Sequence, residues 1–172
     1  MAILFFERDR DKYPWLSNFH PAPFCLGGVV YADVERFFQS QKPKARPQRE
    51  EIIKAETPGL AKKLGRKCDL RADWEKVKDH IMRLGLYGKF SQHPDLRNQL
   101  IDTGQEQLIE DNPKDKYWGR YDKEGDNKLG LLLMELRGYL RIWRMLANTQ
   151  MLRTGVFLFP ANILPPNVEV DG

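Results

Sequence analysis

The hydrophobic and polar positions along the chain follow helical periods over most of its length. The clearest apolar stripe begins near residue 127 and recurs at spacings of three and four residues, as one face of a helix does. It consists of Leu129, Leu132, Leu133, Leu136 and Leu140. A second stripe, beginning at Trp74, predicts a helix over 73–90 with Asp73 as its N-cap. Further helices are predicted at about 48–56, 58–66 and 93–104.

Short extended segments are predicted between these helices. The run "ILFF" at 3–6 and the stretch near 24–31 fit strands, and "QLIED" at 107–111 fits another. After residue 146 the helical period is lost, and three prolines follow. The pattern therefore predicts one predominantly helical α+β domain with a few short strands over residues 1–146. A C-terminal extension of unknown role is expected over 147–172.

Composition narrows the class of protein only slightly. The chain has 172 residues, 41% of them hydrophobic and 30% charged, with a net charge of +4. A mild basic excess is compatible with phosphate-bearing ligands and does not require them. The two cysteines form no CxxC pair, and no apolar run is long enough to span a membrane. A cytoplasmic protein without membrane attachment is expected.

The segment "DVERFFQSQKPK", residues 33–44, combines helical spacing with reactive side chains. Asp33 can cap a helix here, and Pro43 is expected to end it at Lys42. At 100° per residue, Glu35, Gln39 and Lys42 share one narrow stripe over two turns. Such a stripe can place an acid and a lysine together at the edge of a cleft.

The rest of this helix has a less specific explanation. Phe38 lies beside the stripe, whereas Arg36 and Ser40 are expected to point away from the core. Gln41 falls within the apolar arc, where a buried amide needs hydrogen-bond partners. An acid near the start of a helix and a lysine near its end also complement the helix dipole. Pattern alone therefore leaves a structural role and a functional role open.

Several familiar catalytic signatures are missing from the sequence. The three histidines have no metal-ligand spacing, and no HExxH motif or cysteine cluster occurs. No GxGxxG, GxxxxGK[ST] or GxSxG motif is present. Metal-dependent, dinucleotide-dependent and serine-nucleophile mechanisms lose support, so no metal or cofactor is expected.

Six segments, in order along residues 4–141, together resemble the NADAR family. They are "LSNFHPAPF" (16–24), "VERFFQSQK" (34–42), "LGR" (64–66), "WEKVKDHIMRLGLYGKF" (74–90), "YWG" (117–119) and "DNKLGLLLMELR" (126–137). The resemblance implies an N-glycosidase that cleaves the bond between a phosphorylated ribose or ADP-ribose and a base-like amine. Its substrates would be riboflavin-pathway intermediates or ADP-ribosylated guanine, the latter in nucleic acid. No metal requirement is implied.

The resemblance places the chemistry on Glu35 and Lys42. A carboxylate can stabilise the oxocarbenium character that develops as a ribosyl C–N bond breaks. A lysine with a depressed pKa can instead attack the anomeric carbon and form a Schiff base. Lys44 and Arg46 are expected to favour the neutral form of Lys42. Which of Glu35 and Lys42 leads catalysis stays open.

Eleven further residues are expected to bind substrate. Arg66 would pair with phosphate, Trp118 would stack on the base, and Asp126 with Asn127 would cap the last helix. The full set is Ser17, Asn18, Phe19, Phe38, Gln39, Gln41, Arg66, Trp118, Gly119, Asp126 and Asn127. Gly130, inside the same helix, predicts a close approach of another backbone or a ligand.

Some features depart from the family pattern or fit other functions. Arg36 stands where family members often have histidine, and "RYDKEG" (120–125) is more charged than its counterparts. A non-catalytic ADP-ribose or nucleotide-binding module is an alternative, although pairing Glu35 with Lys42 suits a binder less well. A basic nucleic-acid-binding protein is less favoured, because the basic residues are dispersed. The physiological substrate and the oligomeric state stay open.

Overall fold

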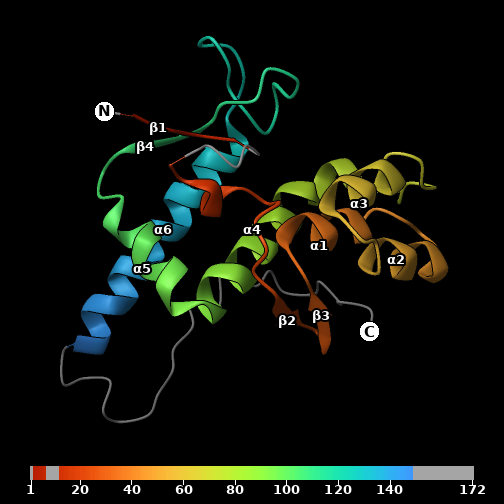
Figure 1. Cartoon of the computed structure of the whole chain (residues 1–172), viewed down its shortest axis with the longest axis horizontal. Coiled ribbons are helices and arrows are strands. Elements are labelled where there is room, and N and C mark those ends of the chain that lie inside the picture. The colour runs from red at the N-terminus through yellow and green to blue at the C-terminus, as the bar shows by residue number, and fades with distance from the viewer. Residues whose placement is uncertain (1, 7–11, 149–172) are drawn as a thin grey trace.

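The computed structural model describes residues 2–6 and 12–148, and this part of the chain forms a predominantly helical α+β domain (Figure 1). The helices are α1 (Val34–Ser40), α2 (Arg46–Ile53), α3 (Pro58–Gly65), α4 (Trp74–Gln92), α5 (Pro94–Asp102) and α6 (Lys128–Asn148), with a 3-10 turn η1 at Pro14–Leu16. The strands are β1 (Ala2–Phe5), β2 (Phe24–Leu26), β3 (Val29–Tyr31) and β4 (Gln107–Glu110). The predicted fold class is confirmed. Helix α6 continues to Asn148, two residues into the extension predicted over 147–172, and the rest of that extension lies outside the described residues.

The strands form two separate pairs. β1 and β4 are parallel, with Phe5 opposite Glu110 at their carboxyl ends. β2 and β3 form an antiparallel hairpin around the turn Gly27–Gly28, so the stretch predicted near 24–31 is two short strands. The first pair lies against α6, whereas the hairpin lies near α1 and α4 (Figure 1). Parallel pairing brings the end of β4 beside distant parts of the chain.

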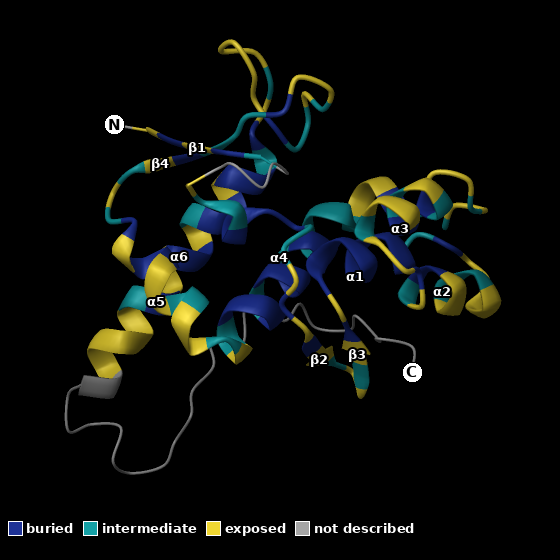
Figure 2. Cartoon of the chain, viewed as in Figure 1, coloured by how far each residue is buried: buried dark blue, intermediate teal, exposed yellow. Residues whose placement is uncertain are grey.

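Helix α1 lies at the centre of the domain and is buried on every side (Figure 2). It packs against α2, α3 and α4. The prediction that Arg36 and Ser40 point away from the core was wrong, because α2 and α3 cover that side of the helix. Arg36 is only 8% exposed. An interior helix of this kind can present polar groups to a cavity only where its neighbours leave a gap.

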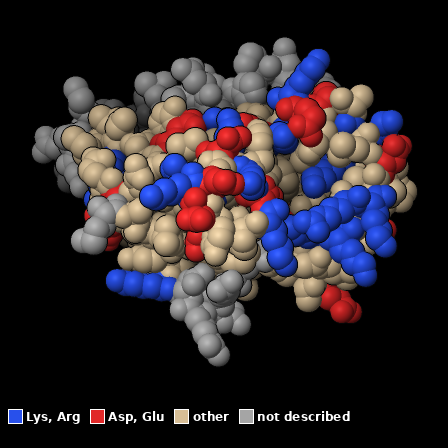
Figure 3. All heavy atoms as spheres, turned by 90° about the horizontal axis from the view of Figure 1, so that it is seen from above, with Lys and Arg blue, Asp and Glu red and all other residues tan. Residues whose placement is uncertain are grey.

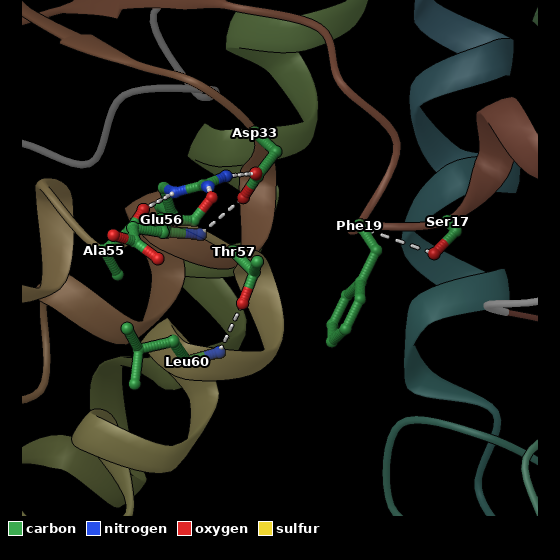
Figure 4. A network of polar contacts seen from close by, with 8 residues as sticks. Ser17, Phe19, Asp33, Ala55, Glu56, Thr57 and Leu60 are labelled. Atoms are coloured by element: carbon green, nitrogen blue, oxygen red, sulfur yellow. Dashed lines mark hydrogen bonds and ion pairs between the residues drawn. The ribbon is translucent and has the colours of Figure 1, made fainter.

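Arg36 joins the start of α1 to the segment between α2 and α3; Figure 4 labels its partners Asp33, Ala55 and Glu56. Its guanidinium pairs with Asp33 and donates to the carbonyl oxygens of Ala55 (2.8 Å) and Glu56 (2.7 Å). Asp33 also caps α1 by accepting from the Arg36 amide at 2.8 Å, as predicted. The positive charge of Arg36 is buried, but a carboxylate and two carbonyl oxygens accept its hydrogen bonds, which offsets the cost of burial. This network fixes α3 relative to α1.

The ends of two helices differ from the predictions. α1 ends at Ser40, two residues before the predicted end, and Gln41 is its C-cap. Asp73 makes no side-chain cap for α4, because its carboxylate pairs with the guanidinium of Arg71 at 2.6 Å. In the part of the chain that the structure describes, no helix is both long enough and apolar enough to cross a membrane.

Helix α6 approaches the backbone of β4 at Gly130. A Cβ atom at this position would overlap the carbonyl oxygen of Leu108. The predicted close approach is therefore confirmed, and the neighbour is backbone. Asn127 bridges the same two elements, donating to Leu108 O at 2.9 Å and accepting from the Glu110 amide at 3.0 Å. Its side chain thus holds β4 in place.

Candidate active site

One cavity of about 100 Å³ lies where α1, α3, α4, the turn after η1 and the segment after β4 meet. Polar side chains supply most of its wall, together with Phe19, Phe38, Met82 and Trp118. The lining residues are Ser17, Asn18, Phe19, Glu35, Phe38, Gln39, Lys42, Lys62, Arg66, Met82, Glu110, Asn112, Asp115 and Trp118. A concave site with convergent polar groups is the usual form of a small-ligand site.

The stripe predicted from helical geometry forms one wall of this cavity. Glu35, which is 5% exposed, accepts a 2.7 Å hydrogen bond from Gln39 Nε2. Lys42 lies just beyond the end of α1, where its amide donates to Gln39 O at 3.2 Å. This turn keeps Lys42 on the same side as Glu35 and Gln39, even though the helix has ended.

Burial lowers the pKa of the Lys42 ammonium group below its ordinary value. Glu35 opposes this effect, whereas the positive charges of Arg66 and Lys62 reinforce it. The predicted cause was different, because Lys44 and Arg46 are exposed and pair with Asp69 and Glu50. A lysine of this kind has a larger neutral, nucleophilic fraction at neutral pH than an exposed lysine.

The turn after η1 forms a second wall. The amide of Phe19 donates to Ser17 Oγ at 3.1 Å, and the buried Lys89 donates to Ser17 O at 2.8 Å. Asn18 O accepts from the amide of Glu35 at 3.1 Å, which ties this turn to α1. The ring of Phe19 extends away from Ser17 (Figure 4). Lys62 Nζ lies 5.2 Å from the centre of that ring.

Helix α3 gives the cavity a basic side. Lys62 and Arg66 line the cavity, and Lys63 and Lys67 are exposed beside them. Lys and Arg side chains gather on the side of the molecule where α2 and α3 lie (Figure 3). Elsewhere on that face they alternate with Asp and Glu. Basic groups at a cavity mouth favour a phosphate-bearing ligand.

The segment after β4 forms the acidic and aromatic side. Trp118 meets Phe38 edge to face, with ring centres 5.3 Å apart. Asp115 accepts from the Trp118 amide at 2.9 Å, which fixes the loop below the indole. Glu110 has its pKa raised to about 7, first by burial and then by the negative charge of Asp115. This side of the cavity therefore holds a carboxyl group that titrates near neutral pH.

Nine of the thirteen predicted site residues line the cavity: Ser17, Asn18, Phe19, Glu35, Phe38, Gln39, Lys42, Arg66 and Trp118. The other four lie outside its lining. Gln41 faces Ser40 Oγ at 3.2 Å, and Gly119 packs behind the wall against Asn112 and Glu110. Asn127 holds β4 as described above, so its side chain is used there rather than as a cap, and Asp126 is exposed.

Sequence reasoning missed five lining residues: Lys62, Met82, Glu110, Asn112 and Asp115. Lys62 had a detectable signal, since it stands one helical turn before Arg66 in a predicted helix. Glu110 falls within a predicted strand, but nothing local indicated which distant elements it would meet. The other three have no local pattern that distinguishes them from structural residues.

Three buried polar atoms at the cavity have no hydrogen-bond partner in the part of the chain that the structure describes. They are Asn18 Oδ1, Gln39 Oε1 and Glu110 Oε2. An unpaired buried polar atom costs about 1–3 kcal/mol, so native proteins retain such atoms mainly where a ligand or water completes them. The two amide oxygens favour a ligand that offers hydrogen-bond donors, whereas the Glu110 carboxyl can accept when ionised and donate when protonated.

Comparisons with known proteins show which family this chain resembles. The family model described as the NADAR domain matches residues 4–141. The N-glycosidase YbiA of Escherichia coli is 40% identical over 144 residues, spanning 82% of this chain and 90% of that protein. An N-glycosidase of Nostoc punctiforme is 38% identical over 80% of this chain and 92% of its own length. A riboflavin biosynthesis protein of Vibrio vulnificus is 33% identical over 81% of this chain but only 38% of that protein.

The fold has a close relative among solved structures. The NMR structure of Escherichia coli YbiA superposes with a TM-score of 0.75 at 37% sequence identity. The match covers 84% of this chain and 89% of that one. The family match over residues 4–141 includes every residue that lines the cavity.

Proposed function

The chain belongs to the NADAR domain family and is an N-glycosidase, and we propose that its substrate joins a phosphorylated ribose or ADP-ribose to a base-like amine. The observation that carries this proposal is the meeting of Glu35 and Lys42 at one cavity. A carboxylate and a lysine of lowered pKa are the groups that cleavage of a ribosyl C–N bond can use. The basic side of α3 supports a phosphorylated sugar, and Trp118 supports a planar base.

In the lysine route, the neutral Nζ of Lys42 forms a bond to the anomeric carbon as the glycosidic C–N bond breaks. The bonding electron pair leaves with the base nitrogen, which takes up a proton. Opening of the sugar ring then gives a Schiff base, and water hydrolyses it to release the sugar and regenerate the amine. Glu35 stabilises the positive charge that develops on the sugar.

In the carboxylate route, Glu35 stabilises the same charge while water attacks the anomeric carbon directly. Lys42 then serves as a positive charge near the phosphate or the leaving group. Both routes use the same two residues and yield the same products. They differ in whether a covalent lysine adduct forms.

Two substrate classes fit this site. A riboflavin-pathway intermediate, in which a ribose phosphate is joined to an aminopyrimidine, is supported by the name of the Vibrio vulnificus relative. ADP-ribosylated guanine in DNA offers a second phosphate to the basic side formed by Lys62 and Arg66. Exposed Lys63 and Lys67 extend that side beyond the cavity, where a nucleic-acid backbone could lie.

To test this proposal, the protein is incubated separately with the phosphoribosylamino pyrimidine and with DNA that carries ADP-ribosylated guanine. Release of free base or sugar is followed by mass spectrometry. We expect wild type to cleave at least one substrate and Glu35→Gln to cleave it at least about 100-fold more slowly. Glu124→Gln, at an exposed glutamate that pairs with Lys116 outside the cavity lining, serves as the matched control. Failure of wild type to cleave either substrate would refute the proposed substrate class.

The dependence of KM on salt concentration distinguishes the two substrate classes. Each phosphate contact with a nucleic acid releases a counterion, so the affinity for DNA falls steeply as salt rises. Binding of a small phosphorylated intermediate depends less on salt. Measuring KM at two salt concentrations for each cleaved substrate therefore shows whether the protein engages a nucleic-acid backbone.

A further inference from the structure

Glu110 is the last residue of β4, and its backbone is held on several sides. Its amide donates to Asn127 Oδ1 at 3.0 Å, and its carbonyl accepts from the amides of Asn112 (2.9 Å) and Arg120 (2.8 Å). It stands opposite Phe5 in the parallel pair. The side chain therefore extends into the cavity from a well-fixed backbone, as a group involved in chemistry must.

The carboxyl group of Glu110 lies among charges of both signs. Asp115, from the segment after β4, and Glu35, from α1, disfavour its ionised form. Lys62 from α3 and a hydrogen bond from Asn112 favour that form. Burial is the largest effect, and together these groups raise the pKa of Glu110 to about 7. A substantial protonated fraction is therefore present at neutral pH.

One oxygen of this carboxyl group, Oε2, is buried without a hydrogen-bond partner among the described residues. A protonated carboxyl needs an acceptor for its O–H group. A ligand nitrogen with a lone pair is such an acceptor. An unpaired oxygen in a cavity wall therefore indicates a group that completes its bonding only when substrate is present.

Glu35 and Glu110 occupy different electrostatic settings in the same cavity. Glu35 accepts an N–H group from Gln39 and interacts with the positive charge of Lys42. Glu110 faces the acids Asp115 and Glu35. Two carboxyl groups in such contrasting surroundings commonly divide the roles of charge stabiliser and proton donor.

We propose that Glu110 is the general acid of this enzyme, the residue that protonates the departing base nitrogen. As the C–N bond breaks, its electron pair goes to the nitrogen of the base, and the proton of the Glu110 carboxyl is transferred to that nitrogen. The carboxylate recovers a proton when water enters in the hydrolytic half of the reaction. The inference rests on the proposed function, because it requires an N-glycosidic bond in this cavity.

The test compares two substrates with different leaving groups. The first is the N-glycoside that wild type cleaves, whose nitrogen needs protonation in order to leave. The second is 4-nitrophenyl riboside 5-phosphate, whose nitrophenolate leaves without a proton. We expect Glu110→Gln to slow cleavage of the first about 100-fold or more at pH 6. Cleavage of the second should change by less than about threefold, since its leaving group bypasses the acid.

The matched control is Glu124→Gln, on the same segment after β4. Glu124 is exposed and pairs with Lys116, so its substitution removes the same charge away from the cavity. We expect the control to cleave both substrates at the wild-type rate. Equal slowing of both substrates by Glu110→Gln would assign Glu110 a positioning role and overturn the inference.

The failure of the inference can be distinguished from the failure of the proposed function. If wild type cleaves both substrates and Glu110→Gln does so equally well, only the general-acid role is lost. If wild type cleaves no ribosyl N-glycoside, the proposed function is refuted, and the inference with it. Circular dichroism and thermal unfolding of each variant show whether it is folded.

Two measurements on wild type also test the role of Glu110. Titration of the Glu110 side-chain carboxyl carbon by NMR should give a midpoint near pH 7. The alkaline side of the pH–rate profile for the N-glycoside should fall with the same midpoint, because the proton donor is lost as pH rises. A midpoint near that of an exposed glutamate would overturn the inference.

Discussion

Gln39 Nε2 donates a 2.7 Å hydrogen bond to Glu35 Oε1, one helical turn earlier, and Gly65 of α3 packs directly against the same amide. A Cβ atom at Gly65 would overlap Gln39 Oε1 and lie 3.0 Å from Gln39 Cδ. The hydrogen bond that orients Glu35 therefore depends on the absence of a side chain on a neighbouring helix. The absence of a side chain at Gly65 on α3 therefore allows Gln39 on α1 to reach Glu35.

Gly65→Ala should reduce activity more than stability. The added methyl group displaces the end of the Gln39 side chain and presses on its Cβ atom at 3.1 Å, so the fold adjusts at a cost of about 1–2 kcal/mol. Gln39 then loses its contact with Glu35, and we expect kcat/KM to fall about tenfold. The measurements are steady-state kinetics on the cleaved N-glycoside and urea unfolding.

Gly59→Ala in the same helix is the matched control. A Cβ atom at Gly59 would meet only Thr57 Oγ1, at 3.9 Å. Activity should be unchanged, and stability should rise by up to about 1 kcal/mol because alanine favours helix more than glycine does. Wild-type kinetics in Gly65→Ala would contradict the role assigned to Gln39.

Lys42→Arg should abolish covalent trapping by borohydride while it keeps a positive charge beside Glu35. Arginine stays protonated, so it cannot attack the anomeric carbon. We expect wild type to form an adduct detectable by mass spectrometry, and Lys63→Arg to form it equally well. An adduct of undiminished yield in Lys42→Arg would rule out Lys42 as the nucleophile and favour the carboxylate route.

The rate of adduct formation should also depend on pH in a defined direction. Burial lowers the pKa of Lys42, so the neutral amine becomes dominant at a lower pH than for an ordinary lysine. With 4-nitrophenyl riboside 5-phosphate, whose leaving group needs no proton from Glu110, the rate should rise with pH and reach a plateau below pH 10.5, the ordinary pKa of lysine. A rate that still rises beyond that pH would show that the site does not activate this amine.

Lys89→Met tests whether the hydrogen bond from Lys89 to Ser17 O holds the turn that lines the cavity. The fully buried ammonium group donates to Ser17 O, and burial lowers its pKa to about 7, against a partial opposing effect of Asp33. The substitution removes the hydrogen bond that fixes the turn at Ser17 and Asn18. We expect kcat/KM to fall about tenfold, with Lys76→Met, exposed on the same helix, as the control.

The stability of the Lys89 variant relative to wild type should change with pH. Between pH 7 and about 10.5 the unfolded chain holds a proton on Lys89 that the folded protein has lost, so wild-type stability rises with pH. Methionine has no such dependence. The stability of Lys89→Met minus that of wild type should therefore fall by roughly 3 kcal/mol over this range. Urea unfolding of both proteins at pH 7 and 10 measures this difference in stability. A difference that does not change with pH would contradict the lowered pKa of Lys89.

Gly130→Ala should destabilise the fold by about 3 kcal/mol or more. The new methyl group would overlap the Leu108 carbonyl oxygen, a backbone atom that cannot turn aside. Gly138→Ala, on the same helix, is the matched control, because a Cβ there meets nothing within 4 Å. It should gain up to about 1 kcal/mol in unfolding free energy. Equal stabilities of the two variants would contradict the packing of α6 on β4.

The stripe of Glu35, Gln39 and Lys42 was predictable because it depends on local backbone geometry. The 3.6-residue period places Glu35 and Gln39 on one side of α1 wherever that helix packs, and the turn from Gln39 to Lys42 keeps Lys42 on the same side. The α6 stripe and its glycine were predictable for the same reason, and they implied a close neighbour at Gly130. Predictions failed where the outcome depended on another element, as for Arg36, which α2 and α3 cover.

The sequence by itself thus determined the helices, the fold class and the side of α1 that carries the reactive residues, because these follow from local periodicity. Only the tertiary structure decided what faces that side. The parallel pairing of β1 with β4 brings Glu110 to the cavity, and the Arg36 network fixes α3 so that Lys62 lies near it. Burial and long-range charge then set the pKa values of Lys42 and Glu110, since desolvation depends on the surroundings of a group and not on its place in the chain.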